Sequence, residues 1–264
     1  MIQIYKIIFS VLFLIFLPFL WLFPRIRETM GGRIYLKRAP IKDRETIWFH
    51  GASAGDIFSI KSIIDLYYQA YKDRFYILVT SNTLSGRDIV KRYLPSDIIF
   101  EYMPFDIPIF IKNFLKTYRP RLLFIEASEF WPILIHLASN NNVRIILING
   151  NIKKEKVLVY KLLSLLSSNP FKRYDFMIVR NRESLESAIQ LGVDERRIKT
   201  CTNTKYINVF TMKNAGIPER LKERFGSVNR LVVFGSIHYE EEDIIIQTIK
   251  ELLKKDIDIK ILIA

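Results

Sequence analysis

The residues best suited to chemistry follow a short apolar run near residue 50. The chain reads Ile47-Trp-Phe-His-Gly-Ala-Ser-Ala-Gly-Asp56, a buried-strand pattern that leads into small residues and ends on a carboxylate. Ser53, Ala54 and Gly55 leave room for another molecule near the backbone, and Asp56 stands where the next helix begins, as anionic residues prefer. The segment predicts one edge of an active site; an N-capped strand-to-helix turn is the structural alternative.

Two further strand ends carry polar groups. Tyr76–Thr80 leads into Ser81-Asn-Thr-Leu-Ser-Gly86, which meets a polar ligand or, as we favour, caps the helix that follows. Leu122–Ile125 leads into Glu126-Ala-Ser-Glu-Phe-Trp-Pro132, with two acids beside a buried strand. Either these acids belong to a site, or Glu129 caps the next helix and Glu126 binds a backbone group.

Several other kinds of site find no support in the residues. The chain has one cysteine and three histidines, and none of them stands in a cluster with metal-ligand spacing. We expect Cys201 to fill space in a strand rather than to react. No Gly-x-Gly-x-x-Gly follows the first strand, so a dinucleotide fingerprint is absent.

The elements that must position these residues alternate regularly after Arg44. Apolar runs typical of buried parallel strands are Thr46–His50, Tyr76–Thr80, Ile98–Met103, Leu122–Glu126, Val143–Ile148 and Phe176–Val179. Helical spacing predicts a core-facing stripe of Ile57, Ile60, Ile64, Tyr67, Tyr68 and Tyr71. The pattern predicts an α/β fold with a doubly wound parallel sheet, whose ligands lie at the carboxyl ends of the strands.

The first 24 residues predict a membrane anchor. Ile7 to Phe23 is almost wholly apolar and, with Ile2 to Tyr5, is about long enough to cross a bilayer. A cleavable signal peptide is less favoured, because no small-x-small site follows. Pro18 and Pro24 leave open a helix that lies in one leaflet. A basic flank follows the apolar run and, by the positive-inside tendency, places the body in the cytoplasm: Arg25, Arg27, Arg33, Lys37 and Arg38.

The formal net charge of +13 agrees with a membrane surface or a phosphorylated ligand. Nucleic acid is disfavoured as a partner, because the cations are spread along the whole chain and no aromatic-plus-basic module is present.

The sequence predicts two folded units. An N-terminal Rossmann-like domain covers 33–207, and 208–229 has the composition of an interdomain connection. Residues 230–264 then read as strand Arg230–Gly235, helix Glu240–Lys254 and strand Ile259–Ala264. One strand-helix-strand piece is too small to be a domain, so we expect the start of an incomplete second Rossmann-like domain.

In this order the segments resemble the bacterial 3-deoxy-D-manno-octulosonic acid (Kdo) transferases. The resemblance rests on the apolar anchor, on His50-Gly-Ala-Ser-Ala-Gly-Asp56 for the family's His-x-x-Ser-x-Gly-Glu, and on Thr80 to Gly86. Further matching segments are Tyr102-Met-Pro-Phe-Asp106, Glu129-Phe-Trp-Pro132, Leu191-Gly192, Asn203-Thr-Lys205-Tyr206 and Ser236-Ile-His238-Tyr-Glu-Glu-Glu242. Together they cover almost the entire chain.

The resemblance implies a GT-B-like glycosyltransferase that moves Kdo from CMP-Kdo onto a lipid A precursor in lipopolysaccharide core biosynthesis. It implies an inverting, metal-independent reaction with no cofactor, at the bacterial inner membrane, with Asp56 as the base and Glu126 and Lys205 assisting. The acceptor-binding residues it implies are His50, Ser53, Gly55 and Glu129. The donor-binding residues it implies are Ser236, His238, Glu241 and Glu242.

Three departures bear on activity. Asp56 is one methylene shorter than the family's glutamate, and an ungapped alignment puts Ala127 on the family's first acid, with Glu126 one residue out of register. The chain stops at Ala264, where the family continues with its nucleotide-binding half. We therefore weigh an enzyme, or a piece of one completed by a partner chain, against a non-enzymatic membrane-attached remnant that binds acceptor lipid or a partner. A soluble nucleotide-sugar epimerase with a similar sheet is a third, less favoured class.

Overall fold

The computed structural model describes residues 2–35, 43–127, 129–208, 223, 230–255 and 259–263. Its contacts divide the chain into two compact units, Met1–Phe210 and Thr211–Ala264, which are described separately.

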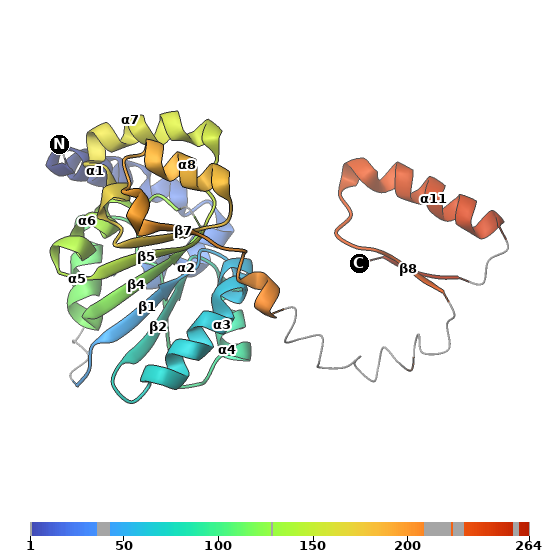
Figure 1. The fold of residues 1–264 in the computed structure, drawn as a ribbon, viewed down its shortest axis with the longest axis horizontal. Coiled ribbons are helices and arrows are strands. Elements are labelled where there is room, and N and C mark those ends of the chain that lie inside the picture. The colour runs from blue at the N-terminus through green and yellow to red at the C-terminus, as the bar shows by residue number, and fades with distance from the viewer. Residues whose placement is uncertain are drawn as a thin grey trace. The chain divides into compact units, whose positions relative to one another are not determined.

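The first unit is built on a seven-stranded sheet in the order β3-β2-β1-β4-β5-β6-β7 (Figure 1). Every neighbouring pair of strands is parallel. The strands are β1 (Thr46–His50), β2 (Tyr76–Ser81), β3 (Ile99–Tyr102), β4 (Pro120–Glu126), β5 (Arg144–Gly150), β6 (Phe176–Val179) and β7 (Ile198–Thr200). The predicted α/β class with a parallel sheet is confirmed.

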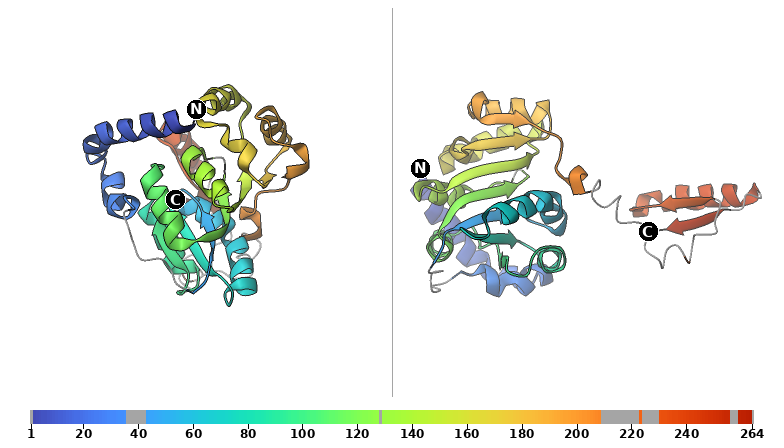
Figure 2. Two further views of the ribbon diagram at one scale, coloured as in Figure 1. Left: turned by 90° about the vertical axis from the view of Figure 1, so that its left-hand side faces the viewer. Right: turned by 60° about the horizontal axis from the view of Figure 1, so that its bottom comes forward.

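Helices cover both faces of this sheet, as the doubly wound pattern predicts. They are α1 (Ile2–Leu20), α2 (Pro24–Arg33), α3 (Ala54–Tyr71), α4 (Leu84–Tyr93), α5 (Pro108–Tyr118), α6 (Pro132–Asn140), α7 (Val157–Ser167) and α8 (Arg182–Gln190). Single 3-10 turns occur at η1 (Lys154–Lys156), η2 (Pro170–Arg173) and η3 (Glu195–Arg197). The ribbon shows α3 and α4 on one side of the sheet and α5 and α6 on the other (Figures 1 and 2).

Two apolar clusters, one on each face, hold the layers together. Successive residues of a strand point to opposite faces, so Trp48 of β1 packs into the cluster of α5 and α6, whereas Phe49 packs into that of α3 and α4. Both side chains are fully buried. Because both faces are covered, the central strands are continuous apolar runs, which is why the sequence reveals them clearly.

The structure corrects three details. Ile57, Ile60 and Ile64 are buried as expected, but Tyr71 at the end of the stripe is 40% exposed because it lies on the last turn of α3. Cys201 is exposed and follows β7 rather than filling a strand. Strand β7 itself was not predicted, since its three residues include only one buried apolar side chain.

Helix α1 is the one segment among the described residues that is long and apolar enough to cross a membrane. None of its residues is buried in the protein. It lies beside α7 (Figure 2). It also touches the sheet domain through Phe13, whose ring centroid lies 5.0 Å from that of Phe105 and 6.0 Å from that of Phe110. The spanning and the in-plane arrangement of α1 both stay predictions.

The second unit contains the predicted strand, helix and strand. Strand β8 (Leu231–Phe234) pairs in parallel with β9 (Lys260–Ile263), and the 3-10 turn η4 (Tyr239–Glu241) and helix α11 (Glu242–Lys254) connect them. The predicted connection 208–229 lies mostly outside the described residues, so it stays a prediction.

Candidate active site

The loop after β1 begins with a close approach that only glycine allows. A Cβ on Gly51 would lie 2.9 Å from Cδ1 and 3.0 Å from the backbone nitrogen of Ile57, inside normal contact distance. The chain can therefore turn tightly from β1 into α3 and place the first turn of that helix at the carboxyl edge of the sheet.

Ser53 and Asp56 close a capping box at the start of α3. The Asp56 backbone N–H donates to Ser53 Oγ (3.4 Å), while the Ser53 N–H and Oγ–H both donate to Asp56 Oδ2, at 2.9 and 2.7 Å. The capped turn expected as the structural alternative is thus present. Among the described residues nothing donates to Asp56 Oδ1, so the cap holds one carboxylate oxygen and leaves the other available.

The turn after β2 is a helix cap, as favoured from the sequence. Thr83 is the N-cap of α4 and accepts a hydrogen bond from the Gly86 backbone at 3.1 Å. Ser81 donates to the carbonyl of Ala52 at 3.0 Å, which ties this turn to the loop after β1.

His50 lies at the centre of a buried hydrogen-bond chain behind that loop. Its Nδ1 is 2.9 Å from Thr80 Oγ1, and its Nε2 is 2.9 Å from Glu129 Oε2. The indole N–H groups of Trp48 and Trp131 donate to Thr80 and to Glu129, respectively. The chain joins the ends of β1 and β2 to the loop after β4, so three candidate segments meet here.

Charge around Glu129 keeps its carboxylate ionised. Burial by itself raises the pKa of Glu129, but hydrogen bonds from His50 and Trp131 and the positive charge of Arg33 outweigh it and hold the pKa below the usual value. Arg33, at the end of α2, is partly buried and donates from Nε to the carbonyl of Met103 at 3.0 Å. Burial lowers the pKa of Arg33 to about 10, against the opposing effect of Glu129.

Glu126, the last residue of β4, is 1% exposed. Its Oε2 accepts from the Ala127 N–H at 2.7 Å, and its Oε1 lies 3.5 Å from Arg180 Nη2, just after β6. Burial raises the pKa of Glu126 to about 7; the Ala127 N–H and Arg180 oppose this rise, and the negative charge of Asp56 adds to it. Glu126 and Asp56 therefore influence each other electrostatically. The backbone partner that the structural alternative gave to Glu126 is present.

The alternative in which Glu129 caps the following helix is wrong. Trp131 is the N-cap residue of α6 and makes no side-chain cap. The first free N–H groups of α6 instead donate to Asp106, from Ile133 at 3.0 Å and from Leu134 at 2.7 Å. Because Asp106 reaches this helix from a distant loop, neighbouring residues could not reveal the pairing.

The segment that carries Lys205 is held against α3 by a polar network. Asn149, at the end of β5, donates to Ser59 Oγ (3.1 Å) and Thr204 Oγ1 (2.7 Å) and accepts from the Thr204 N–H (3.0 Å). Thr204 Oγ1 also donates to the Ser59 carbonyl at 2.7 Å. Asn203 accepts from the Lys205 N–H at 2.9 Å. Lys205 itself is exposed, with Nζ 5.3 Å from the ring centroid of Tyr206.

The expected donor-binding residues all lie in the second unit. Ser236 adopts the left-handed conformation (φ 59°) after β8. The His238 N–H donates to Glu241 Oε2 at 3.0 Å, and Glu242 begins α11. The acidic run is therefore a helix start in this unit, and the donor-binding role stays a prediction.

Sequence reasoning missed several side chains of this edge. Asn149 lies at the end of β5 and Arg180 follows β6, so the rule that ligands lie at strand ends could have drawn attention to them. Arg33 and Ser59 lie on helices and carry no such signal. Within the described residues no group of three or more His, Cys, Asp and Glu side chains could hold a metal ion.

Comparison with known proteins identifies the family. The family model described as "3-Deoxy-D-manno-octulosonic-acid transferase (kdotransferase)" matches residues 25–208, most of the chain. The chain belongs to the Kdo transferase family. The match includes Asp56, Glu126 and Lys205.

Curated Kdo transferases are similar in sequence. The 3-deoxy-D-manno-octulosonic acid transferase of Rickettsia bellii is 30% identical over 223 residues, which are 84% of this chain and 52% of that protein. Those of Rickettsia felis and Chlamydia pneumoniae are 29% and 23% identical, over 83% and 97% of this chain and 46% and 60% of their own length. The chain thus spans about half the length of the curated relatives it matches.

Solved structures share the fold at low sequence identity. The UDP-GlcNAc 2-epimerase of Methanocaldococcus jannaschii has a TM-score of 0.60 at 14% identity, covering 84% of this chain and 65% of that one. That of Neisseria meningitidis, bound to UDP-GlcNAc, has a TM-score of 0.58 at 11% identity, covering 83% and 64%. These matches confirm the GT-B-like fold class and carry no information about the reaction.

Proposed function

We propose that this chain carries the acceptor side of a glycosyltransferase that transfers Kdo from CMP-Kdo to a lipid A precursor in lipopolysaccharide biosynthesis. The observation that supports it most is the family match over residues 25–208, which contains the carboxylates at the carboxyl edge of the sheet. The activity, its substrates and any partner chain that completes the site are all part of this proposal.

Asp56 is the proposed general base. Its Oδ2 is held by the capping box, and its Oδ1 faces no donor among the described side chains and backbone groups. A carboxylate with one anchored oxygen is positioned to take the proton of an acceptor hydroxyl. The deprotonated oxygen forms a bond to the anomeric carbon of Kdo while the bond to CMP breaks, and CMP leaves as a phosphate monoester. This reaction uses neither a metal ion nor a cofactor.

Glu126 and Lys205 are the proposed assisting groups. A carboxyl with a pKa of about 7 exchanges a proton at neutral pH, so Glu126 can accept the proton that Asp56 removes. The Lys205 cation can balance charge that develops on the leaving phosphate. The network of Asn149, Ser59 and Thr204 limits the positions that the Lys205 backbone can take.

The proposed binding residues divide between the two units. His50, Ser53, Gly55 and Glu129 shape the acceptor side, where His50 and Glu129 support the loop rather than stand free. Ser236, His238, Glu241 and Glu242 are proposed to contact CMP-Kdo. Helix α1 is proposed to hold the domain at the bacterial inner membrane, with the body on the cytoplasmic side, where a lipid acceptor is within reach.

The proposal is tested by incubating the purified full chain with CMP-Kdo and lipid A precursor. We expect transfer by the wild type and a loss of at least about a hundredfold in Asp56→Asn, because a positioned base contributes on the order of 10² to 10⁴ in rate. Asp56→Glu keeps the charge and forms the common Ser-x-x-Glu capping box, so it is the matched control that retains activity and stability.

Two results would contradict the enzymatic proposal. Equal rates in the wild type and Asp56→Asn would remove Asp56 from the reaction. A folded wild-type chain that binds lipid A precursor but transfers no sugar would instead favour a membrane-attached protein that binds the lipid without modifying it.

A further inference from the structure

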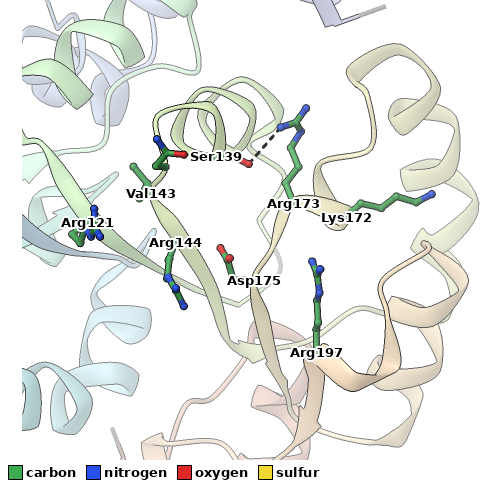
Figure 3. Close-up of a pocket in the computed structure, with 9 residues that line it drawn as sticks. Arg121, Ser139, Val143, Arg144, Lys172, Arg173, Asp175 and Arg197 are labelled. Carbon is green, nitrogen blue, oxygen red and sulfur yellow. Dashed lines mark hydrogen bonds between the residues drawn. The ribbon is translucent and has the colours of Figure 1, made fainter.

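A basic cavity lies at the opposite edge of the sheet from the candidate active site. It has a volume of about 570 Å³ and is lined mainly by the side chains of Arg121, Arg144, Lys172, Arg173, Asp175 and Arg197 (Figure 3). Asp175 stands in the middle of the group, with Arg121 and Arg144 on one side and the other three cations on the other (Figure 3).

The topology of the sheet explains why these residues meet. Arg121 and Arg144 are among the first residues of β4 and β5, and Arg197 immediately precedes β7. Parallel strands begin at one common edge, so side chains scattered over 77 positions, from 121 to 197, come together there. Lys172 and Arg173 join them from η2 (Pro170–Arg173).

The charge of the lining is unbalanced. Five cations face one carboxylate, and Asp175 Oδ2 already accepts from the Ile145 N–H at 2.8 Å. Across the part of the chain that the structure describes, none of the five cations forms an ion pair. Like charges gathered in a concave surface repel one another, and a bound anion relieves that repulsion.

One guanidinium of the group is oriented by the neighbouring helix. Arg173 Nη1 donates to Asn140 Oδ1 at 3.1 Å and to Ser139 Oγ at 3.4 Å, both at the end of α6. The positive field reaches into that helix: burial, together with the charges of Arg173 and Lys6, lowers the pKa of His136 to about 4. His136 is therefore neutral at pH 7 and adds no positive charge beside the cavity.

We propose that this cavity binds a phosphate group. The planar guanidinium group of arginine can form two parallel hydrogen bonds to phosphate oxygens. A dianionic phosphomonoester also neutralises more of the excess positive charge than a single carboxylate does. The volume exceeds that of one phosphate, so the ligand is the phosphorylated end of a larger molecule, either a free metabolite or a lipid headgroup. This site is separate from the carboxyl edge and does not depend on the proposed transfer reaction.

The test uses the purified full chain in a neutral detergent and two probes, inorganic pyrophosphate and dihexanoyl phosphatidic acid, titrated by calorimetry. Arg144→Ala with Arg197→Ala removes two lining cations. Arg74→Ala with Arg92→Ala is the matched control, because both arginines are exposed, lie outside the cavity and take away the same charge. Thermal unfolding checks that both double variants remain folded.

We expect the wild type and the control to bind with equal affinity and the cavity variant to bind at least about tenfold more weakly. A loss confined to pyrophosphate supports a free phosphorylated ligand, and a loss confined to the phosphatidic acid supports a lipid headgroup. Equal weakening in both double variants overturns the proposal, because binding would then follow the net charge of the protein rather than this cavity. No binding of either probe to the wild type overturns it as well, because the cavity would then hold no phosphate.

Discussion

His50 and Glu129, 79 positions apart in the chain, form a side-chain pair with 2.9 Å between Nε2 and Oε2. His50 is fully buried, and the Glu129 side chain is 26% exposed. The pair links the loop that carries Asp56 to the loop that follows Glu126. Together with the pairing of β1 and β4, this contact sets the relative position of the two carboxylates of the candidate site.

Removing Glu129 should destabilise the fold and disturb this edge. We expect Glu129→Ala to lower the free energy of unfolding by about 2 kcal/mol, because hydrogen bonds to a charged group are lost and Nε2 of buried His50 is left without a partner. Glu195→Ala, at an exposed acid, is the control and should change it by less than about 0.5 kcal/mol. Denaturant unfolding at pH 7 measures both.

The same pair predicts a pH dependence. The pKa of Glu129 in the folded protein lies below its ordinary value of 4.5, so its stabilisation is present above pH 4.5 and is lost as the pH falls through the folded-state pKa. The difference in free energy of unfolding between the wild type and Glu129→Ala should therefore become smaller as the pH falls. A difference that stays constant from pH 6 to pH 3 would show that the charge of Glu129 contributes nothing to stability.

The raised pKa of Glu126 predicts the opposite dependence of stability on pH. Its pKa is raised to about 7, so the stabilisation from the protonated form is complete below about pH 4.5 and is lost as the pH rises towards 7. Glu126→Gln stays neutral, and its stability relative to the wild type should rise by about 3 kcal/mol over that range. Unfolding measured at several pH values tests this, and parallel curves for the two proteins would contradict it.

Thr204→Val should release the Lys205 segment without unfolding the sheet. Valine has nearly the same shape but cannot donate to the Ser59 carbonyl or accept from Asn149. We expect amide hydrogen exchange of residues 203–208 to become about tenfold faster, as a local loss of about 1.4 kcal/mol implies. Thr200→Val, at an exposed position of β7, is the control. Equal amide exchange of residues 203–208 in the two variants would argue against the network.

Alanine substitutions at Gly51 and Gly31 should change stability in opposite directions. Alanine at Gly51 would bring its Cβ within 3.0 Å of the backbone of α3, so we expect a loss of about 1–3 kcal/mol and a shifted capping box. Nothing lies within 4 Å of the corresponding Cβ at Gly31 in α2, where alanine should stabilise the helix by up to about 1 kcal/mol. Thermal unfolding of the two variants should shift in opposite directions; a neutral Gly51→Ala would refute the close approach.

Much of the fold could be predicted because both faces of the sheet are covered. Strand β1 is buried at every residue, β6 consists of four apolar residues, and the predicted bounds of both strands match the structure. Strand β7 lies at the edge of the sheet with two of its three residues exposed, so it leaves no such pattern. The core-facing stripe of α3 was predicted to extend to Tyr71, which is exposed. Helical periodicity does not show where the layer that covers a helix ends.

The candidate site was predictable only in part. Ser53 and Asp56 stand three residues apart, and the helix N-terminus they form follows from local preferences. The charged partner of Glu126, Arg180, and the histidine partner of Glu129, His50, lie 54 and 79 positions away at other strand ends, and no local pattern encodes these two pairings.

The sequence by itself determined the alternating strands and helices, the apolar N-terminal segment, the family and the carboxylate at the start of α3, because these depend on periodicity, composition and short motifs. Only the tertiary structure decided that Asp106 rather than Glu129 caps α6, that Glu126 meets Arg180, and that five cations gather at the far edge. The physical reason is that a parallel sheet brings the ends of distant strands to common edges, where burial and charge act between residues that the chain separates widely.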